Sequence, residues 1–401
     1  TLLIISSIAI AILSWWLIKK ERRKARVAEL EYKVIKRLEE RAHSLDWADN
    51  ESRTIPVEKR EKIGSLSFEQ LKEALQKGDV TASDVLTTYY GLALKAHRKT
   101  NCITLFIKES RKWAEEWDER VKNGEKKPPL FGIPISIKEC NKVKGYDQTR
   151  GYAACIGSPA TEDALLVVQL KELGCIPFVQ TNVPTSLLSY TCGNSIYGWT
   201  ENPHKKGRTP GGSSGGESAI IGAGGSIIGI GGDVGGSVRI PAHYTGTAAI
   251  KPSHLRLSSA GVIGSVPGRP LINASDGPMA PTIKTCADIL KHLWSSHWIS
   301  DRDPYVPPVT WRDELFDAKK TYRIGYYTDD GWFTPTPGCS RMVLEAKKIL
   351  EAKGHTVVPF HPPDVPEVYR LFVRSVCVDG GKYLMDKIEN DIPPPVFLTA
   401  L

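Results

Sequence analysis

The sequence predicts an α/β fold, with a mixed, mainly parallel twisted sheet covered by helices on both faces. A helical pattern, a glycine and an apolar strand follow one another twice, at 161–180 and at 342–360. A further strand, LFGIPISIK at 130–138, carries isoleucines at alternate positions, so that they share one face. Helices that alternate with strands in this way are typical of such a sheet.

Composition limits the class of protein. With 41% apolar and 24% charged residues, the 401-residue chain is typical of a globular protein. Its net charge of +8 owes much to one basic run. That run comprises Lys19, Lys20, Arg22, Arg23, Lys24 and Arg26. The remainder is nearly balanced, so we expect no nucleic-acid partner. The eight cysteines are scattered without a C-x-x-C pair, which favours free thiols in a reducing compartment.

Residues 1–18 predict a transmembrane helix. They carry no charge, and as a helix they rise about 27 Å, close to the thickness of a hydrocarbon core. The basic run follows the apolar segment, whereas a cleaved signal peptide carries its positive charges before it. We therefore expect a single-pass N-terminal anchor in the endoplasmic reticulum or another endomembrane, with the remainder of the chain on the cytoplasmic side.

The next segments are assigned by periodicity and by cap signals. Residues 19–45 predict a basic, charged helix with a narrow apolar stripe that packs on the body or supports a homodimer. The stripe consists of Val27, Leu30, Val34 and Leu38. The pattern breaks at 46–64, which predicts a linker, and a catalytic domain follows over 65–401. Ser67 to Gln70 forms a capping box, Thr81 or Ser83 begins the next helix, and Thr161 caps the helix through Leu165.

Two serines lie in glycine-rich segments. GGSSG around Ser213 matches G-x-S-x-G, but a polar loop precedes it instead of the apolar strand that a nucleophile elbow requires. Neither a P-loop nor an S-x-x-K motif is present. In DVGGSVR, the glycines before Ser237 allow backbone N–H groups to converge on a developing oxyanion. A serine nucleophile needs a base, and Lys138, at the end of an apolar strand, is the lysine whose pKa burial would lower.

The motifs PISIKE, PGGSSGGE and GGDVGGSVRIPA together resemble the amidase signature family, from about Ser65 to the C-terminus. The resemblance implies the amidase signature fold and a Ser-Ser-Lys triad, without metal or cofactor. Ser237 would attack the amide carbonyl, Ser213 would pass protons beside a cis peptide bond, and Lys138 would accept and return the proton.

The resemblance also implies three supporting groups of residues. The oxyanion hole comprises the N–H groups of Val234, Gly235, Gly236 and Ser237. Ser214 and Arg239 are supporting hydrogen-bonding residues. The substrate channel is lined by Leu187, Leu188 and Tyr190, together with Val376 and Cys377. The residues alone leave other interpretations open: Arg239 as a structural ion-pair partner, Asp233 as a brace for its loop, and Leu187 and Leu188 as ordinary core.

Within the family, the membrane anchor, the basic helix and the glutamate after GGSSGG are most similar to the fatty-acid amide hydrolases. The predicted function is hydrolysis of long-chain fatty-acid amides to fatty acid and amine. The alternatives are another amidase activity, such as the glutaminase subunit of tRNA-dependent amidation, and an inactive membrane-tethered scaffold. The chain stops at PPPVFLTAL, short of the family's length, so we expect it to lack a membrane-binding cap and much of the acyl channel.

Overall fold

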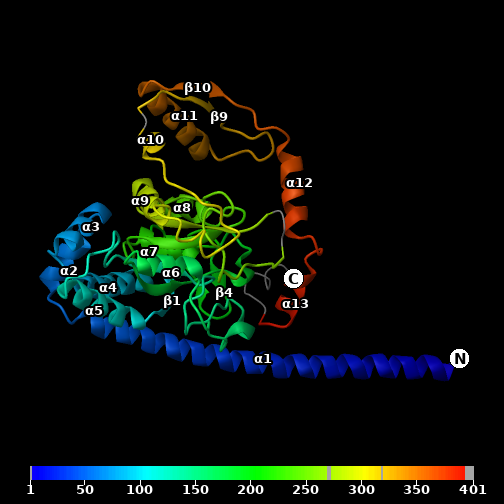
Figure 1. Ribbon diagram of the computed structural model, residues 1–401. Helices are drawn as coiled ribbons and strands as arrows, with labels where there is room; N and C mark the ends of the chain where they lie inside the picture. Colours follow the sequence, from blue (N-terminus) through cyan, green and yellow to red (C-terminus); the bar gives the residue numbers. More distant parts are fainter. Residues whose placement is uncertain (1, 269–271, 318, 393–401) are drawn as a thin grey trace. The chain divides into compact units, whose positions relative to one another are not determined.

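The computed structural model describes residues 2–268, 272–317 and 319–392, with side chains from residue 12 onward. The described residues form two compact units (Figure 1). The first comprises residues up to 267, 273–310 and those from 382 onward, and the second is built mainly from 311–381.

A six-stranded sheet forms the centre of the first unit. Its strands are β1 (Ile103–Phe106), β2 (Pro134–Lys138), β3 (Ile176–Thr181), β6 (Gly229–Asp233), β7 (Ala248–Ala249) and β8 (Ser275–Ala280), in the order β1-β3-β2-β6-β8-β7. β2 is parallel to both of its neighbours, and the other three pairings are antiparallel. The mixed sheet is confirmed, but its mainly parallel character is not. The loop that joins β7 to β8 contains no described helix, and an antiparallel pair needs no helical crossover.

The first unit also contains the helices α2 (Val57–Gly64), α3 (Phe68–Lys77), α4 (Ala82–Thr100), α5 (Glu109–Lys122), α6 (Leu165–Glu172), α7 (Gly215–Gly222), α8 (Arg239–Thr245), α9 (Ile283–Leu293) and α13 (Lys382–Glu389). Of these, α4, α5, α6, α7, α8 and α9 pack against the sheet. Two 3-10 turns, η1 (Ala153–Cys155) and η2 (Thr185–Leu187), and a small hairpin of β4 (Gly193–Asn194) and β5 (Gly198–Trp199) belong to the same unit. The capping box from Ser67 and the N-cap at Thr81 are confirmed. Thr161 does not cap α6, because that helix begins at Leu165 after Ala164.

The N-terminal helix α1 (Leu2–Ser52) is continuous (Figure 1). Its stripe contacts the body as expected at Leu30 and Val34, which pack with Ala153, Ile156 and Tyr197. The helix continues beyond residue 45, and α2 follows it, so the segment 46–64 is mostly helical instead of a linker. Both helices pack against α4, and Ala48 and Ile63 are fully buried. This burial explains why the chain stays helical where the sequence pattern breaks.

None of the helices in the described part of the chain is long and apolar enough to cross a membrane. The transmembrane helix predicted over 1–18 is therefore not supported. Beyond Ile18, α1 continues with the basic run instead of further apolar residues, and the side chains of residues 1–11 lie outside the described part.

The second unit contains the other predicted helix, glycine and strand. It is built from α10 (Asp313–Phe316), β9 (Arg323–Tyr326), α11 (Pro337–Ala352), β10 (Thr356–Pro359) and α12 (Val365–Val376). β9 and β10 are parallel and form a sheet of their own. The elements were predicted correctly, but they do not extend the six-stranded sheet.

Close packing around α7 gives a first prediction, that Gly216→Ala lowers the free energy of unfolding by about 1–3 kcal/mol. A Cβ at Gly216 would lie 2.4 Å from the backbone nitrogen and 2.5 Å from the carbonyl oxygen of Asn182. Backbone atoms cannot move aside as a flexible side chain can, so α7 must shift. Chemical denaturation followed by circular dichroism measures the change.

The matched control is Gly338→Ala in α11, where an added Cβ meets no atom within 4 Å. Alanine favours a helix over glycine, so this variant should be as stable as the wild type or slightly more stable. Equal stability of the two variants would contradict the close approach of α7 to Asn182.

Candidate active site

Lys138, the last residue of β2, is buried in the first unit, with 2% of its surface exposed. Its Nζ donates a hydrogen bond to Oγ of Ser213 at 2.7 Å and another to the carbonyl oxygen of Gly232 at 3.0 Å. Ser213 is equally buried. The structure therefore brings together the lysine and one serine that the sequence analysis selected.

The loop before α7 carries both neighbouring serines. The peptide bond between Gly212 and Ser213 is cis, as the resemblance implied. Ser214 is fully buried, its Oγ donates to the carbonyl oxygen of Gly232 at 3.4 Å, and its N–H donates to the carbonyl oxygen of Ser237 at 3.1 Å. This last bond joins the loop of Ser213 to the loop of Ser237.

Ser237 lies between β6 and α8 and is half-buried. Of the four N–H groups predicted for an oxyanion hole, that of Gly236 donates to Oδ1 of Asp233 at 2.6 Å and is already occupied. The N–H groups of Val234, Gly235 and Ser237 have no hydrogen-bond acceptor within the part of the chain that the structure describes. These three remain able to bind an anionic oxygen.

Asp233 braces this loop. Its carboxylate also accepts from the N–H of Val238 at 3.1 Å, and the Arg239 guanidinium binds it at 2.9 and 3.0 Å. Burial raises the pKa of Asp233, but Arg239 and the backbone N–H donors outweigh burial and hold the pKa below its usual range. Arg239, whose side chain is 56% exposed, thus forms the structural ion pair that the sequence left open.

The residues predicted for a substrate channel are only partly brought together. Leu188 and Tyr190 are exposed, and Tyr190 lines a pocket of about 410 Å³ with Arg239, Ile240, His243 and Tyr244. Tyr190 therefore lies beside the loop of Ser237. Leu187 closes η2 and is half-buried, whereas Val376 and Cys377 belong to the second unit.

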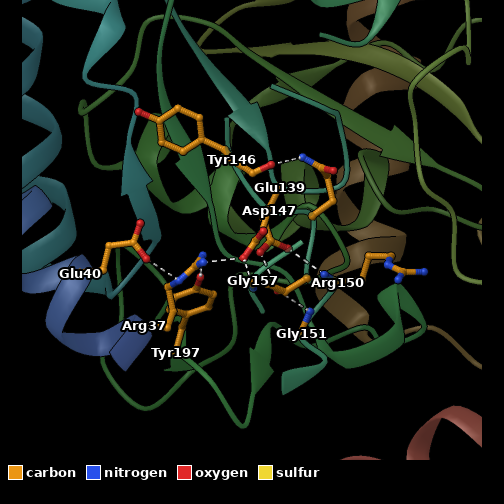
Figure 2. Close-up of polar contacts among 11 residues, drawn as sticks. Arg37, Glu40, Glu139, Tyr146, Asp147, Arg150, Gly151, Gly157 and Tyr197 are labelled. Atoms are coloured by element: carbon orange, nitrogen blue, oxygen red, sulfur yellow. Dashed lines mark hydrogen bonds and ion pairs between the residues drawn. The ribbon is translucent and has the colours of Figure 1, made fainter. Parts of the chain in front are cut away.

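A buried polar network includes Glu139, the residue that follows Lys138 in sequence (Figure 2). Glu139 accepts hydrogen bonds from Oγ1 of Thr149 at 2.6 Å and from the N–H of Arg150 at 2.9 Å. Burial raises the pKa of Glu139 to about 7. The carbonyl oxygen of Arg150 in turn accepts from the N–H of Ser186 at 2.9 Å. The network therefore ties the end of β2 to the segment that contains η2.

The segment that contains Asp147 and Gly157 also contacts α1. Arg37 of α1 donates to Oδ2 of Asp147 at 2.5 Å, and the N–H of Gly157 donates to that oxygen at 2.7 Å (Figure 2). Neither Arg37 nor Glu139 was predicted from the sequence to be a site residue. Glu139 directly follows the lysine in PISIKE, which was the only available signal.

Two other acids, Glu217 and Asp276, are buried. The sequence pointed to Glu217 only as the glutamate after GGSSGG, and it did not point to Asp276 as a site residue. Burial raises the pKa of each to about 7, and Lys138 partly opposes that rise. Glu217 accepts from hydroxyls of Ser136 and Thr181, both at 2.6 Å. Neither carboxyl oxygen of Asp276 has a hydrogen-bond partner among the residues that the structure describes. The acid in the strand sequence SDGPMA is the signal that could have indicated Asp276.

The chain is similar to known proteins over most of its length. A family model described as Amidase matches residues 84–400. Fatty acid amide hydrolase 1 of Caenorhabditis elegans is 52% identical over 375 residues, which covers 93% of this chain and 66% of that protein. The vitamin D3 hydroxylase-associated protein of Gallus gallus is 40% identical, covering 83% of this chain and 71% of that protein.

A solved structure of a fatty acid amide hydrolase is also similar. It has a TM-score of 0.78 at 27% identity, covering 94% of this chain and 68% of the other. The chain thus spans about two thirds of the length of these proteins.

Proposed function

The chain belongs to the amidase signature family, and we propose that it is a serine amidase that hydrolyses long-chain fatty-acid amides to fatty acid and amine. One observation carries the proposal: a buried lysine amine lies 2.7 Å from the Ser213 hydroxyl, in a loop bonded to that of Ser237. A buried lysine beside a hydroxyl fits acid–base chemistry without histidine.

In this proposal Ser237 is the nucleophile. Its Oγ attacks the amide carbonyl carbon while its proton passes to Ser213, whose own proton passes to the neutral amine of Lys138. The negative charge then formed on the carbonyl oxygen is bound by the N–H groups of Val234, Gly235 and Ser237.

The tetrahedral intermediate collapses when the carbon–nitrogen bond breaks. Lys138, now an ammonium, returns the proton through Ser213 to the leaving nitrogen, because an unprotonated amine anion is a very poor leaving group. Water then attacks the acyl-enzyme and loses its proton along the same route. Ser237 regains its proton, and the fatty acid leaves.

The choice of a fatty-acid amide rests on similarity and on exposed apolar residues. Two of the similar proteins are named as fatty acid amide hydrolases. Leu188 and Tyr190 are exposed apolar residues, and Tyr190 shares a pocket with Arg239 and Ile240 of α8, the helix that follows Ser237. Attachment to a membrane through residues 1–18, placement at an endomembrane and a homodimer stay predictions from the sequence, and the chemistry above requires none of them.

Chain-length selectivity tests the substrate class. A long-chain primary amide should inhibit labelling of the protein by a fluorophosphonate at a concentration at least about 100-fold lower than a short-chain amide. Each buried CH₂ contributes about 0.8 kcal/mol, so four suffice for this factor. Equal potency of the two amides would contradict the fatty-acid assignment and leave the amidase itself standing.

A further inference from the structure

Asp276 is a buried acid to which the proposed chemistry assigns no role. It is 4% exposed, and neither carboxyl oxygen has a hydrogen-bond partner within the described chain. An ionised carboxyl in this position is costly unless an opposite charge compensates it. A compensating cation near Asp276 is therefore required whenever the group is charged.

The sheet places Asp276 beside Gly232, a residue that Lys138 contacts. Asp276 of β8 pairs with Gly232 of β6, and the carbonyl oxygen of Gly232 accepts a hydrogen bond from Nζ of Lys138. A Cβ at Gly232 would lie 2.6 Å from Oδ1 of Asp276, so the carboxyl packs directly on this backbone. The lysine amine, the Gly232 peptide and the carboxyl therefore form one contiguous group.

The electrostatic effect between the two residues is reciprocal. Burial raises the pKa of Asp276 to about 7, and the charge of Lys138 acts in the opposite direction. The charge interaction is mutual, so a carboxylate at Asp276 also attracts a positive charge on Lys138. Lys138 is the group whose positive charge opposes the effect of burial on this carboxyl.

The other titratable groups near Lys138 are two cysteines and Glu217. Burial raises the pKa of Cys140 to about 12 and that of Cys192 to about 11, so both thiols stay neutral near neutral pH. Glu217 is also affected by Lys138, but its oxygens accept from Ser136 and Thr181. Asp276 differs from Glu217 because it has no donor of its own.

We propose that Asp276 is a positioning residue that sets the protonation state of Lys138, and with it the pH range in which the enzyme works. The inference rests on the proposed amidase function and deepens it. An ionised Asp276 stabilises the ammonium that forms when Lys138 receives the proton of Ser237. It thereby lowers the energy of the tetrahedral intermediate and retains the proton that the leaving nitrogen needs.

The test is the pH dependence of kcat/KM for a long-chain amide, measured with the full chain in wild-type and Asp276→Asn forms. Asparagine keeps the shape and removes the charge. Without that charge the ammonium is disfavoured, so the acid-side midpoint of the profile should fall by about one pH unit or more. We also expect the plateau rate to fall about tenfold.

Glu139→Gln is the matched control. It removes a buried carboxyl adjacent to Lys138 in sequence, but that carboxyl binds Thr149 and Arg150. The acid-side midpoint should stay in place in this variant, whatever happens to the rate. If Asp276→Asn fails to fold, Asp276→Ser also removes the charge and should shift the midpoint in the same direction.

The outcomes separate this inference from the proposed function. If Asp276→Asn loses activity equally at every pH with its midpoint unchanged, Asp276 is only structural and the inference is overturned. An equal shift in Glu139→Gln would overturn it as well, since the effect would not be specific to Asp276. If the wild type neither turns over amides nor reacts with a fluorophosphonate, the proposed function itself fails.

Discussion

Ser237→Ala is expected to reduce amide hydrolysis at least about 10⁴-fold, the largest effect of any single substitution in this protein. The variant removes the attacking oxygen, so no acyl-enzyme can form, and only binding and the oxyanion donors remain to assist water. The fold should be unaffected, because Ser237 is half-buried and its structural contact is made by its carbonyl oxygen. Steady-state turnover of a long-chain amide measures the loss, with circular dichroism to check folding.

Ser83→Ala is a suitable control, since Ser83 is also half-buried but lies in the first turn of α4. It should keep wild-type activity. Retained turnover in Ser237→Ala would show that the nucleophile is another residue.

Lys138→Ala should lower amide turnover by about 10²–10⁴ at neutral pH. The substitution removes the only amine that contacts the Ser213 hydroxyl in the described structure, so neither activation of Ser237 nor protonation of the leaving nitrogen is assisted. Activity should also come to depend on added base, which replaces part of the missing proton transfer. Turnover measured across pH, with and without a small amine, tests both effects.

The matched control is Lys142→Ala, four residues along the chain. Lys142 is partly exposed and forms an ion pair with the exposed Glu162. Exposed ion pairs contribute little, so its activity and stability should stay close to the wild type. Unchanged amide turnover of Lys138→Ala at neutral pH would remove lysine from the mechanism.

Local features of the sequence were sufficient for part of the fold. Alternating isoleucines predicted β2, and the side-chain pattern of Ser67 and Gln70 predicted the start of α3. Both depend on contacts within a few residues. The parallel or antiparallel sense of a pairing depends on the whole connection, so the antiparallel β8 was not predicted.

The end of α1 shows the same limitation. The segment 46–52 lacks a helical pattern of its own, and it stays helical because Ala48 is buried where α1 packs against α4. Likewise, the helix and the strand at 342–360 were predicted, but the order of elements along the chain does not show which sheet the strand joins.

Some features of the candidate site could be predicted from local sequence, and others depend on how the chain folds. The glycines around Ser213 and Ser237 and the strand of Lys138 are local signals, and the lysine–Ser213 contact followed from them together with the family resemblance. The occupation of the Gly236 N–H by Asp233 depends on how the loop folds back. Asp276 lies far along the chain, and the pairing of β6 with β8 brings it to Gly232, which Lys138 contacts. No sequence spacing carries that information.

The most direct test of the central claim is to react the wild-type protein with a fluorophosphonate and to identify the modified peptide by mass spectrometry, with Ser237→Ala in parallel. The account predicts a single adduct on Oγ of Ser237 in the wild type and none in the variant. An adduct on Ser213 or another serine, or no reaction of the folded wild type, would contradict Ser237 as the nucleophile of a serine amidase.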